Sequence, residues 1–289
     1  MWPEPHIRPF GCGPKACVDP ALDARVIHDL SFPIGASTND MSDQTMIPDL
    51  SYTHVDAIAR HILAIRRDQP GKTICLMKGD VKTAFRLVPV HHDTSTRFAG
   101  HIPELDLVVI DLCLPFGWTG SPAQYGQFGG AIKFLVRRES PRSLNPMLCD
   151  SETFFCFDWV NDYVLVEPET PGRLETCAAA LRLAMLAVLG PRSVNEKKFT
   201  SWKTTLVALG LQWDTEAMTV SMPEDKIHTA ILRLQAIKKN KQTSRQELAK
   251  LLGSLRHKNN TNNGSAARLG MCCMAAFEVC HFSPTCQSR

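Results

Sequence analysis

Apolar residues recur at helical spacing in several parts of the chain. Within residues 54–67 they fall on one helical face, at Val55, Ile58, Ile62 and Ile65. An Ala- and Leu-rich stretch from residue 174 to residue 189 also has a helical composition, and Gly190-Pro191 ends it. Ser121-Pro122 predicts a further helix to about residue 138, because serine caps helices and proline is tolerated in the first turn.

Short apolar runs between these segments predict β-strands. The runs cover residues 73–77, 107–114, 206–213 and 218–222, and the last two are expected to pair. The first run ends at Gly79-Asp80, so we expect a buried strand that carries an aspartate at its C-terminal end. Two more runs, residues 154–157 and 163–166, flank the polar pair Asn161-Asp162 and predict a hairpin with Asp162 at or near its tip.

The order of these elements indicates an α+β fold. Residues up to about 50 are rich in Pro and Gly and predict loops with short strands, and the chain turns helical again after Pro223. Antiparallel strands backed by helices satisfy this order. There is no internal repeat and no Gly/Ser linker that divides the chain.

Composition narrows the class of protein. The chain has 289 residues, of which 44% are hydrophobic and 21% charged, so a globular protein with a large apolar core is expected rather than a disordered or fibrous one. The N-terminus resembles neither a secretory signal nor a membrane span. Eleven cysteines at irregular spacing indicate reduced thiols. We therefore expect an intracellular protein, in the cytoplasm or nucleus, without a membrane partner.

Basic residues concentrate near the C-terminal end of the chain. The net charge is only +3, but the segment from Lys226 to Lys258 contains nine Lys or Arg residues and only one acidic residue, Glu247. Such a segment either follows the phosphates of a nucleic acid or forms a solvated helix surface. A set of Cys and His residues beyond it offers zinc ligands, or else packs as reduced thiols: Cys272, Cys273, Cys280, His281 and Cys286.

Asp80 and Asp162 are the candidate chemical residues. Phosphoryl transfer needs positioning and charge neutralisation, which carboxylate-bound divalent metals supply. In an antiparallel sheet of the expected order the two aspartates would lie side by side, with carboxylates roughly 4 to 6 Å apart if they share a metal site. Isolated aspartates at strand ends also serve as turn formers or helix caps, so both interpretations stand at this point.

Five segments in a fixed order resemble the motifs of reverse transcriptases. They are Arg25-Val-Ile-His-Asp-Leu-Ser, Gly79-Asp-Val-Lys-Thr-Ala-Phe-Arg-Leu-Val-Pro-Val, Leu114-Pro-Phe-Gly-Trp-Thr-Gly-Ser-Pro-Ala, Trp159-Val-Asn-Asp, and Asn195-Glu-Lys-Lys followed by Leu209-Gly. Leu-Pro-Phe-Gly is most similar to gypsy-like or DIRS-like retrotransposons. The resemblance implies right-hand polymerase fingers in residues 1–72, a palm with inserted fingers strands in 73–222, and a short, truncated helical thumb in 223–289.

The resemblance also implies a role for individual residues. Asp80, the carbonyl of Val81 and Asp162 would bind two Mg²⁺ or Mn²⁺ ions, and Lys198, or Lys197 if the motif is shifted by one, would lie near the leaving pyrophosphate. Phe85 would stack under the sugar of a deoxynucleoside triphosphate. The remaining implied contacts are Arg25 to the triphosphate, Phe116 and Gly117 to nucleotide and template, and Lys238, Lys239, Lys241 and Arg245 to an RNA or DNA template-primer. Without the motif, Phe85 is a core aromatic, Phe116 and Gly117 belong to a simple Pro-Gly turn, and Arg25 is a surface arginine.

Asn161 departs from the family pattern, which has a catalytic aspartate at that position. An amide oxygen coordinates metal but carries no charge, so its presence is expected to cost several kcal/mol of metal binding or transition-state stabilisation. Two functions remain open: an RNA-directed DNA polymerase that uses two metal ions, and a catalytically inactive retrotransposon remnant that keeps only fold and nucleic-acid binding. A third interpretation is an unrelated metabolic α+β enzyme.

Overall fold

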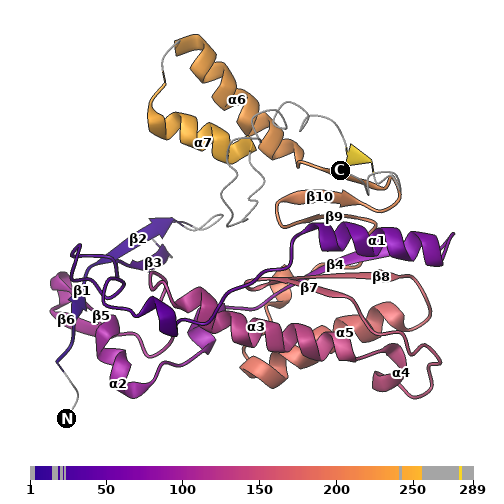
Figure 1. Ribbon diagram of the computed structural model, residues 1–289, viewed down its shortest axis with the longest axis horizontal. Helices are drawn as coiled ribbons and strands as arrows, with labels where there is room; N and C mark the ends of the chain where they lie inside the picture. The colour runs from indigo at the N-terminus through magenta and orange to yellow at the C-terminus, as the bar shows by residue number, and fades with distance from the viewer. Residues whose placement is uncertain are drawn as a thin grey trace. The chain divides into compact units, whose positions relative to one another are not determined.

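The computed structural model describes residues 4–14, 19, 22, 24–240, 243–255 and 280–281. The chain divides into two compact units. The first unit comprises Met1–His54, Lys78–Leu165 and Gly172–Thr200, and the second comprises Val55–Met77, Val166–Pro171 and Ser201–Arg289. Figure 1 gives the labels of the elements.

Short strands occur in the first 50 residues, as the sequence predicts, and they are joined by strands from residues 99–110. Strand β1 (Ile7–Arg8) pairs in parallel with β5 (Ala99–Ile102), which pairs antiparallel with β6 (Leu107–Ile110). Strands β2 (Phe10–Pro14) and β3 (Ala24–His28) form an antiparallel hairpin. The run expected as a strand to residue 114 leaves the β5–β6 ladder after Ile110, and Leu114 instead donates its N–H to Val88.

A three-stranded sheet of order β4-β8-β7 carries the aspartates. Strand β4 spans Ile74–Asp80, β7 spans Cys156–Trp159 and β8 spans Asp162–Pro168. Strands β7 and β8 form the predicted antiparallel hairpin, in which Trp159 is opposite Asp162 and Val160 has a φ of 54° in the turn. Each strand has a continuous apolar run, residues 74–77 of β4 and 163–166 of β8, and both runs are buried.

Two long helices pack beside each other in the first unit, α3 (Ser121–Arg138) and α5 (Arg173–Leu189), and α3 also packs on β7 (Figure 1). Both were predicted with nearly these bounds. Their buried faces and the strands supply the core, which includes Tyr125, Ile132, Phe157, Tyr163 and Leu181. Shorter elements connect them: η1 (Gln44–Met46), η2 (Ala84–Leu87), α2 (His92–Ser95), η3 (Thr96–Phe98), η4 (Pro103–Leu105), α4 (Pro141–Leu144) and η5 (Glu196–Lys198).

The second unit contains helix α1 (Asp56–Asp68), a small antiparallel sheet, and helices α6 (Glu224–Asn240) and α7 (Arg245–Leu255). Its sheet has the order β12-β11-β10-β9. The strands are β9 (Thr205–Ala208), β10 (Leu211–Asp214), β11 (Thr219–Ser221) and β12 (Cys280–His281). Among the described residues no helix is long and apolar enough to span a membrane.

The prediction of one strand over residues 206–213 is wrong. The chain reverses at Leu209-Gly210, which have φ angles of 55° and 80°, so that β9 and β10 form a hairpin. The apolar run continues through the turn and hides it from a period-2 pattern. Gly210 was the local signal, because glycine adopts a positive φ at little cost.

Candidate active site

Asp80 is the last residue of β4, and its side chain is almost fully buried, with 1% exposed. Gly79 makes this close packing possible, since a Cβ there would lie 2.7 Å from Leu181 Cδ2 and 2.8 Å from Phe199 Cζ. After Asp80 the backbone is held by a bond from Val81 N–H to the Asn161 carbonyl, 2.9 Å long. The end of β4 is therefore tied directly to the turn of the β7–β8 hairpin.

Three side chains donate hydrogen bonds to the Asp80 carboxylate. Asn161 Nδ2 lies 2.7 Å and Lys198 Nζ 2.9 Å from Oδ2, while Asn195 Nδ2 lies 2.7 Å from Oδ1. A buried carboxylate needs such compensation, because desolvation disfavours its charge. The structure therefore brings together three residues that the motifs predicted, namely Asp80, Asn161 and Lys198.

Asp162 is the first residue of β8, directly after the turn. Burial raises the pKa of its carboxyl, and the negative charge of Asp80 raises it further, against the opposing effect of Lys78 and Lys198. The two carboxylates thus repel each other within one electrostatic environment. Carboxylate and amide oxygens are ligands that Mg²⁺ and Mn²⁺ accept, and an excess of buried negative charge favours a cation. Asp80, Asp162 and Asn161 therefore fit a divalent ion chemically.

A second set of potential metal ligands lies on α2 and its N-terminal flank. Among the described residues, His91, His92 and Asp93 form one group of three whose ligand atoms all lie within 4.8 Å of one another. All three are exposed, and both histidines are within 3.5 Å of the Asp93 carboxylate. This group belongs to a different element from the β4 and β8 aspartates, and the sequence motifs did not mark it.

The predicted nucleotide residues Phe85, Phe116 and Gly117 form a compact group. Phe85 is buried in η2, and its ring centroid lies 4.9 Å from that of Phe116, which is half exposed. Tyr125 of α3 contacts Phe85 from another side, with ring centroids 5.5 Å apart. Gly117 has a φ of 118°, and a Cβ at this position would overlap the carbonyl oxygen of His28. Only glycine fits there.

The other predicted site residues lie elsewhere or outside the described residues. Val81 follows Asp80, with its side chain buried. Lys238 and Lys239 are in α6 and Arg245 is in α7, all in the second unit. Lys241 is outside the described residues, as are the Arg25 side chain and Cys272, Cys273 and Cys286, while Cys280 and His281 are described only as the strand β12.

Asn195 is the contact that sequence reasoning missed. Its side chain donates to Asp80 Oδ1, and its backbone N–H donates to the Asp80 carbonyl at 3.1 Å. The only sequence signal was its place as the first residue of the Asn195-Glu-Lys-Lys motif. A separation of 115 residues between the two partners leaves no local pattern to reveal the contact.

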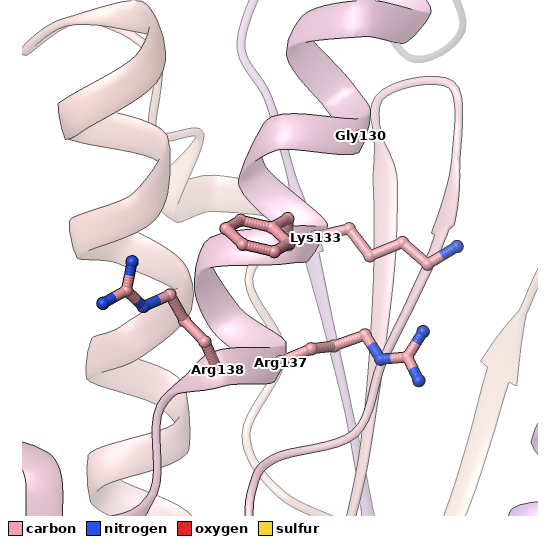
Figure 2. Close-up of a pocket in the computed structure, with 5 residues that line it drawn as sticks. Gly130, Lys133, Arg137 and Arg138 are labelled. Atoms are coloured by element: carbon pink, nitrogen blue, oxygen red, sulfur yellow. The ribbon is translucent and has the colours of Figure 1, made fainter.

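A shallow hollow of about 390 Å³ lies on the C-terminal half of α3, lined by Gly130, Lys133, Phe134, Arg137 and Arg138. Figure 2 shows Lys133 and Arg137 extending to one side of the helix and Arg138 to the other. Lys133 is paired with Asp158 at 2.7 Å. This hollow contains none of the predicted site residues.

Asp80 at the end of β4 acts electrostatically on Asp162 in the neighbouring hairpin, and α3 and α5 pack beside each other. The chain has a reverse-transcriptase-like fold. Three solved structures of foamy viral protease-reverse transcriptase resemble it. The form named dRH, in complex with double-stranded DNA, has a TM-score of 0.57 at 15% identity, over 86% of this chain and 35% of that one. The complex with an RNA/DNA hybrid has a TM-score of 0.51 at 15% identity, over 88% and 28%.

The third structure, a complex with double-stranded DNA, has a TM-score of 0.50 at 14% identity, over 86% of this chain and 42% of that one. The chain therefore spans less than half the length of each of these proteins. No protein-family model matches the sequence, and no curated protein is significantly similar to it. At this identity the likeness establishes the fold.

Proposed function

We propose that the chain is the RNA-directed DNA polymerase core of a gypsy-like or DIRS-like retroelement, which transfers nucleotides with the aid of two divalent metal ions. The observation that carries the proposal is the electrostatic interaction between Asp80 and Asp162, together with the hydrogen bond from Lys198 to the Asp80 carboxylate. The sequence motifs and the fold support it independently.

The residues around the two carboxylates each have a role in this proposal. Asp80, Asp162, the Val81 carbonyl and the Asn161 amide oxygen would hold the cations, Mg²⁺ or Mn²⁺, and these would neutralise charge on the triphosphate. The Lys198 side chain is 57% exposed and donates to Asp80, and its ammonium group has further N–H donors that would donate a proton to, or neutralise, the leaving pyrophosphate.

Residues farther from the carboxylates bind the substrates. Phe85 lies under the sugar of the deoxynucleoside triphosphate, and Phe116 and Gly117 contact nucleotide and template. Arg25 binds the triphosphate through charge-assisted hydrogen bonds. The thumb-like segment, with Lys238, Lys239, Lys241 and Arg245, holds the RNA or DNA template-primer through its phosphates, in the way basic helices bind nucleic acid.

A second candidate function is binding of nucleic acid without catalysis. Its basis is the orientation of Asn161, whose amide donates an N–H to Asp80 and supplies no charge for a cation. A divalent ion needs the amide rotated so that its oxygen faces the site. The two candidate functions share fold and substrate and differ in the chemistry of one side chain.

Primer extension on an RNA template with Mg²⁺ or Mn²⁺ tests the proposal. We expect slow extension by the natural chain and an increase of at least about 100-fold in Asn161→Asp. The missing charge is expected to cost several kcal/mol, and each tenfold change in rate corresponds to about 1.4 kcal/mol of barrier. Asp80→Asn in either background is the inactive control. Extension that is insensitive to Asp80→Asn contradicts the assignment of the site.

Thermal unfolding supplies a readout that is independent of activity. Mg²⁺ should raise the melting temperature of Asn161→Asp more than that of the natural chain, because the added carboxylate should lower the Kd for Mg²⁺. A ligand stabilises the folded state according to its concentration relative to Kd, by about 2.7 kcal/mol at 100 times Kd. If neither protein extends a primer but both bind duplex in a salt-dependent way, the binding function holds. Absence of both activities refutes both functions.

A further inference from the structure

A partly buried ionic cluster lies beside the proposed nucleotide site, in which Asp111 and His28 are buried and the Arg86 side chain is 37% exposed. Arg86 Nη1 donates to Asp111 Oδ1, and His28 Nδ1 lies 3.7 Å from Asp111 Oδ2, a distance too long for a hydrogen bond. The side chains of Asp111 and His28 are 8% and 2% exposed. His28 ends β3, Arg86 belongs to η2, and Asp111 follows β6, so the cluster joins three segments of the first unit.

A partly buried cluster of this kind is costly to build. Desolvation of a carboxylate and a guanidinium often cancels their mutual attraction, so such pairs frequently add little to stability. Among the described residues, His28 Nδ1 and Asp111 Oδ2 also find no hydrogen-bond partner, although both are buried. The Arg86 side chain is partly exposed, so its desolvation costs less, but the buried Asp111 carboxylate and the two unpaired buried atoms still make stability a weak account of this cluster.

Each member of the cluster lies on a segment that leads to, or contacts, a residue of the nucleotide group. Arg86 directly follows Phe85, and Asp111 lies five residues before Phe116. The His28 backbone N–H donates to the Phe116 carbonyl at 3.4 Å. The His28 carbonyl packs against Gly117 so closely that no Cβ could be added there. The cluster therefore holds the segments that place Phe85 and Phe116 with ring centroids 4.9 Å apart.

We propose that Arg86, Asp111 and His28 are positioning residues that set the contact between Phe85 and Phe116, and through it the affinity and sugar selectivity for the incoming nucleotide. The inference rests on the proposed polymerase function and assigns none of the three residues a direct contact with substrate. Loss of the Asp111 charge releases Arg86 and lets η2 shift relative to the Phe116 segment. A loose nucleotide pocket discriminates deoxyribose from ribose less well, because selection there is steric.

The test uses the full chain in the Asn161→Asp background, and compares Asp111→Asn and Arg86→Gln with Arg86→Lys. Asp150→Asn is the matched control, because Asp150 forms another partly buried ion pair of the first unit, with Arg173 at 2.8 Å. Steady-state extension of an RNA-templated primer is measured with deoxy- and ribonucleoside triphosphates, and thermal unfolding verifies that each variant is folded.

We expect Asp111→Asn and Arg86→Gln to raise KM for the deoxynucleotide about tenfold, with kcat changed less, and to reduce the preference for deoxy- over ribonucleotides by a similar factor. Arg86→Lys should recover part of both losses. The double variant Asp111→Asn/Arg86→Gln should have a KM and a sugar preference no more impaired than those of the more impaired single variant, because both substitutions break the same interaction. Asp150→Asn should lower the melting temperature without altering KM or sugar preference.

Unchanged KM and sugar preference in folded Asp111→Asn, with an active parent, overturn the inference and leave the proposed polymerase function intact. If the parent does not extend, calorimetric titration of dTTP into the complex with a dideoxy-terminated primer on an A-containing RNA template replaces the kinetics. Weaker binding in Asp111→Asn but not in Asp150→Asn then supports the inference. A parent that neither extends nor binds dTTP refutes the polymerase function and the inference with it.

Discussion

The Asp80 carboxylate is stabilised by one cation and two neutral amides. These donors compensate its buried charge, and they also occupy lone pairs that a metal ion would use. Asn161 contributes to both effects, since it supplies an N–H in place of the charge that the family pattern has there. The chemistry of this residue therefore decides whether the site favours its own internal hydrogen bonds or a divalent ion.

Asp162 makes stability depend on pH in a predictable direction. Burial and the Asp80 charge raise its folded-state pKa above the unfolded value. The ionised form of Asp162 is therefore less favourable in the folded protein than in the unfolded chain, and as pH falls through the folded pKa the folded state takes up the proton first. The free energy of unfolding contributed by this residue increases with falling pH, until the unfolded pKa is passed.

Asp162→Asn removes this titration, and we expect it to raise the free energy of unfolding near pH 7 relative to the natural chain. The difference should shrink as pH is lowered toward about 4, because Asp162 of the natural chain becomes protonated. Urea denaturation of both proteins across this range measures it. A difference that is constant with pH would show that Asp162 is not electrostatically strained.

At the scale of elements, the C-terminal end of strand β4, which carries Asp80, packs closely against α5 and the segment after η5. Gly79 is the point of closest approach, because a Cβ at this position would lie 2.7 Å from a Leu181 side-chain atom and 2.8 Å from a Phe199 side-chain atom. We expect Gly79→Ala to destabilise the fold by about 1–3 kcal/mol through overpacking and to displace Asp80. Denaturant unfolding measures the first effect, and primer extension in the Asn161→Asp background measures the second.

Gly130→Ala is the matched control for this substitution. Gly130 lies in the middle of α3, and a Cβ there has no atom within 4 Å, so alanine fits. The change should stabilise the protein by about 0.5–1 kcal/mol, the usual preference of a helix for alanine over glycine. Equal effects of the two substitutions would contradict the close packing of β4.

Most elements defined by local patterns were predictable, whereas contacts between segments distant in the sequence were not. The helix over residues 121–138 and the hairpin around Asn161 were predicted from local patterns, and the structure confirms both. The expected cap is wrong, because Gly120 is the N-cap residue and the Ser121 hydroxyl donates to the Pro115 carbonyl instead. The turn at Leu209-Gly210 was missed because the apolar run continues through it. Asn195 and the Arg86–Asp111–His28 cluster escaped notice because their partners are joined only by the fold.

At the scale of the whole molecule, the proposed chemistry and the proposed duplex binding belong to different units. The carboxylates lie in the first unit, and the basic residues Lys238, Lys239 and Arg245 lie in the second. Binding and catalysis should therefore be separable by substitution. Loss of cations from α6 should weaken duplex binding without regard to sequence, whereas Asn161 should affect catalysis and metal binding alone.

Salt dependence distinguishes phosphate contacts from a solvated helix surface. For the double variant K238Q/K239Q we expect weaker binding of an RNA/DNA duplex, and a slope of log K against log salt that is shallower by up to about 1.8, because each phosphate contact contributes about 0.9. The control R137Q/R138Q removes two adjacent cations from α3 (Figure 2). It changes the net charge equally, so any long-range electrostatic effect is shared. Fluorescence anisotropy between about 50 and 200 mM salt measures both slopes. Equal slopes for the two variants would mean that α6 does not contact the duplex and that its cations serve only to solvate the helix.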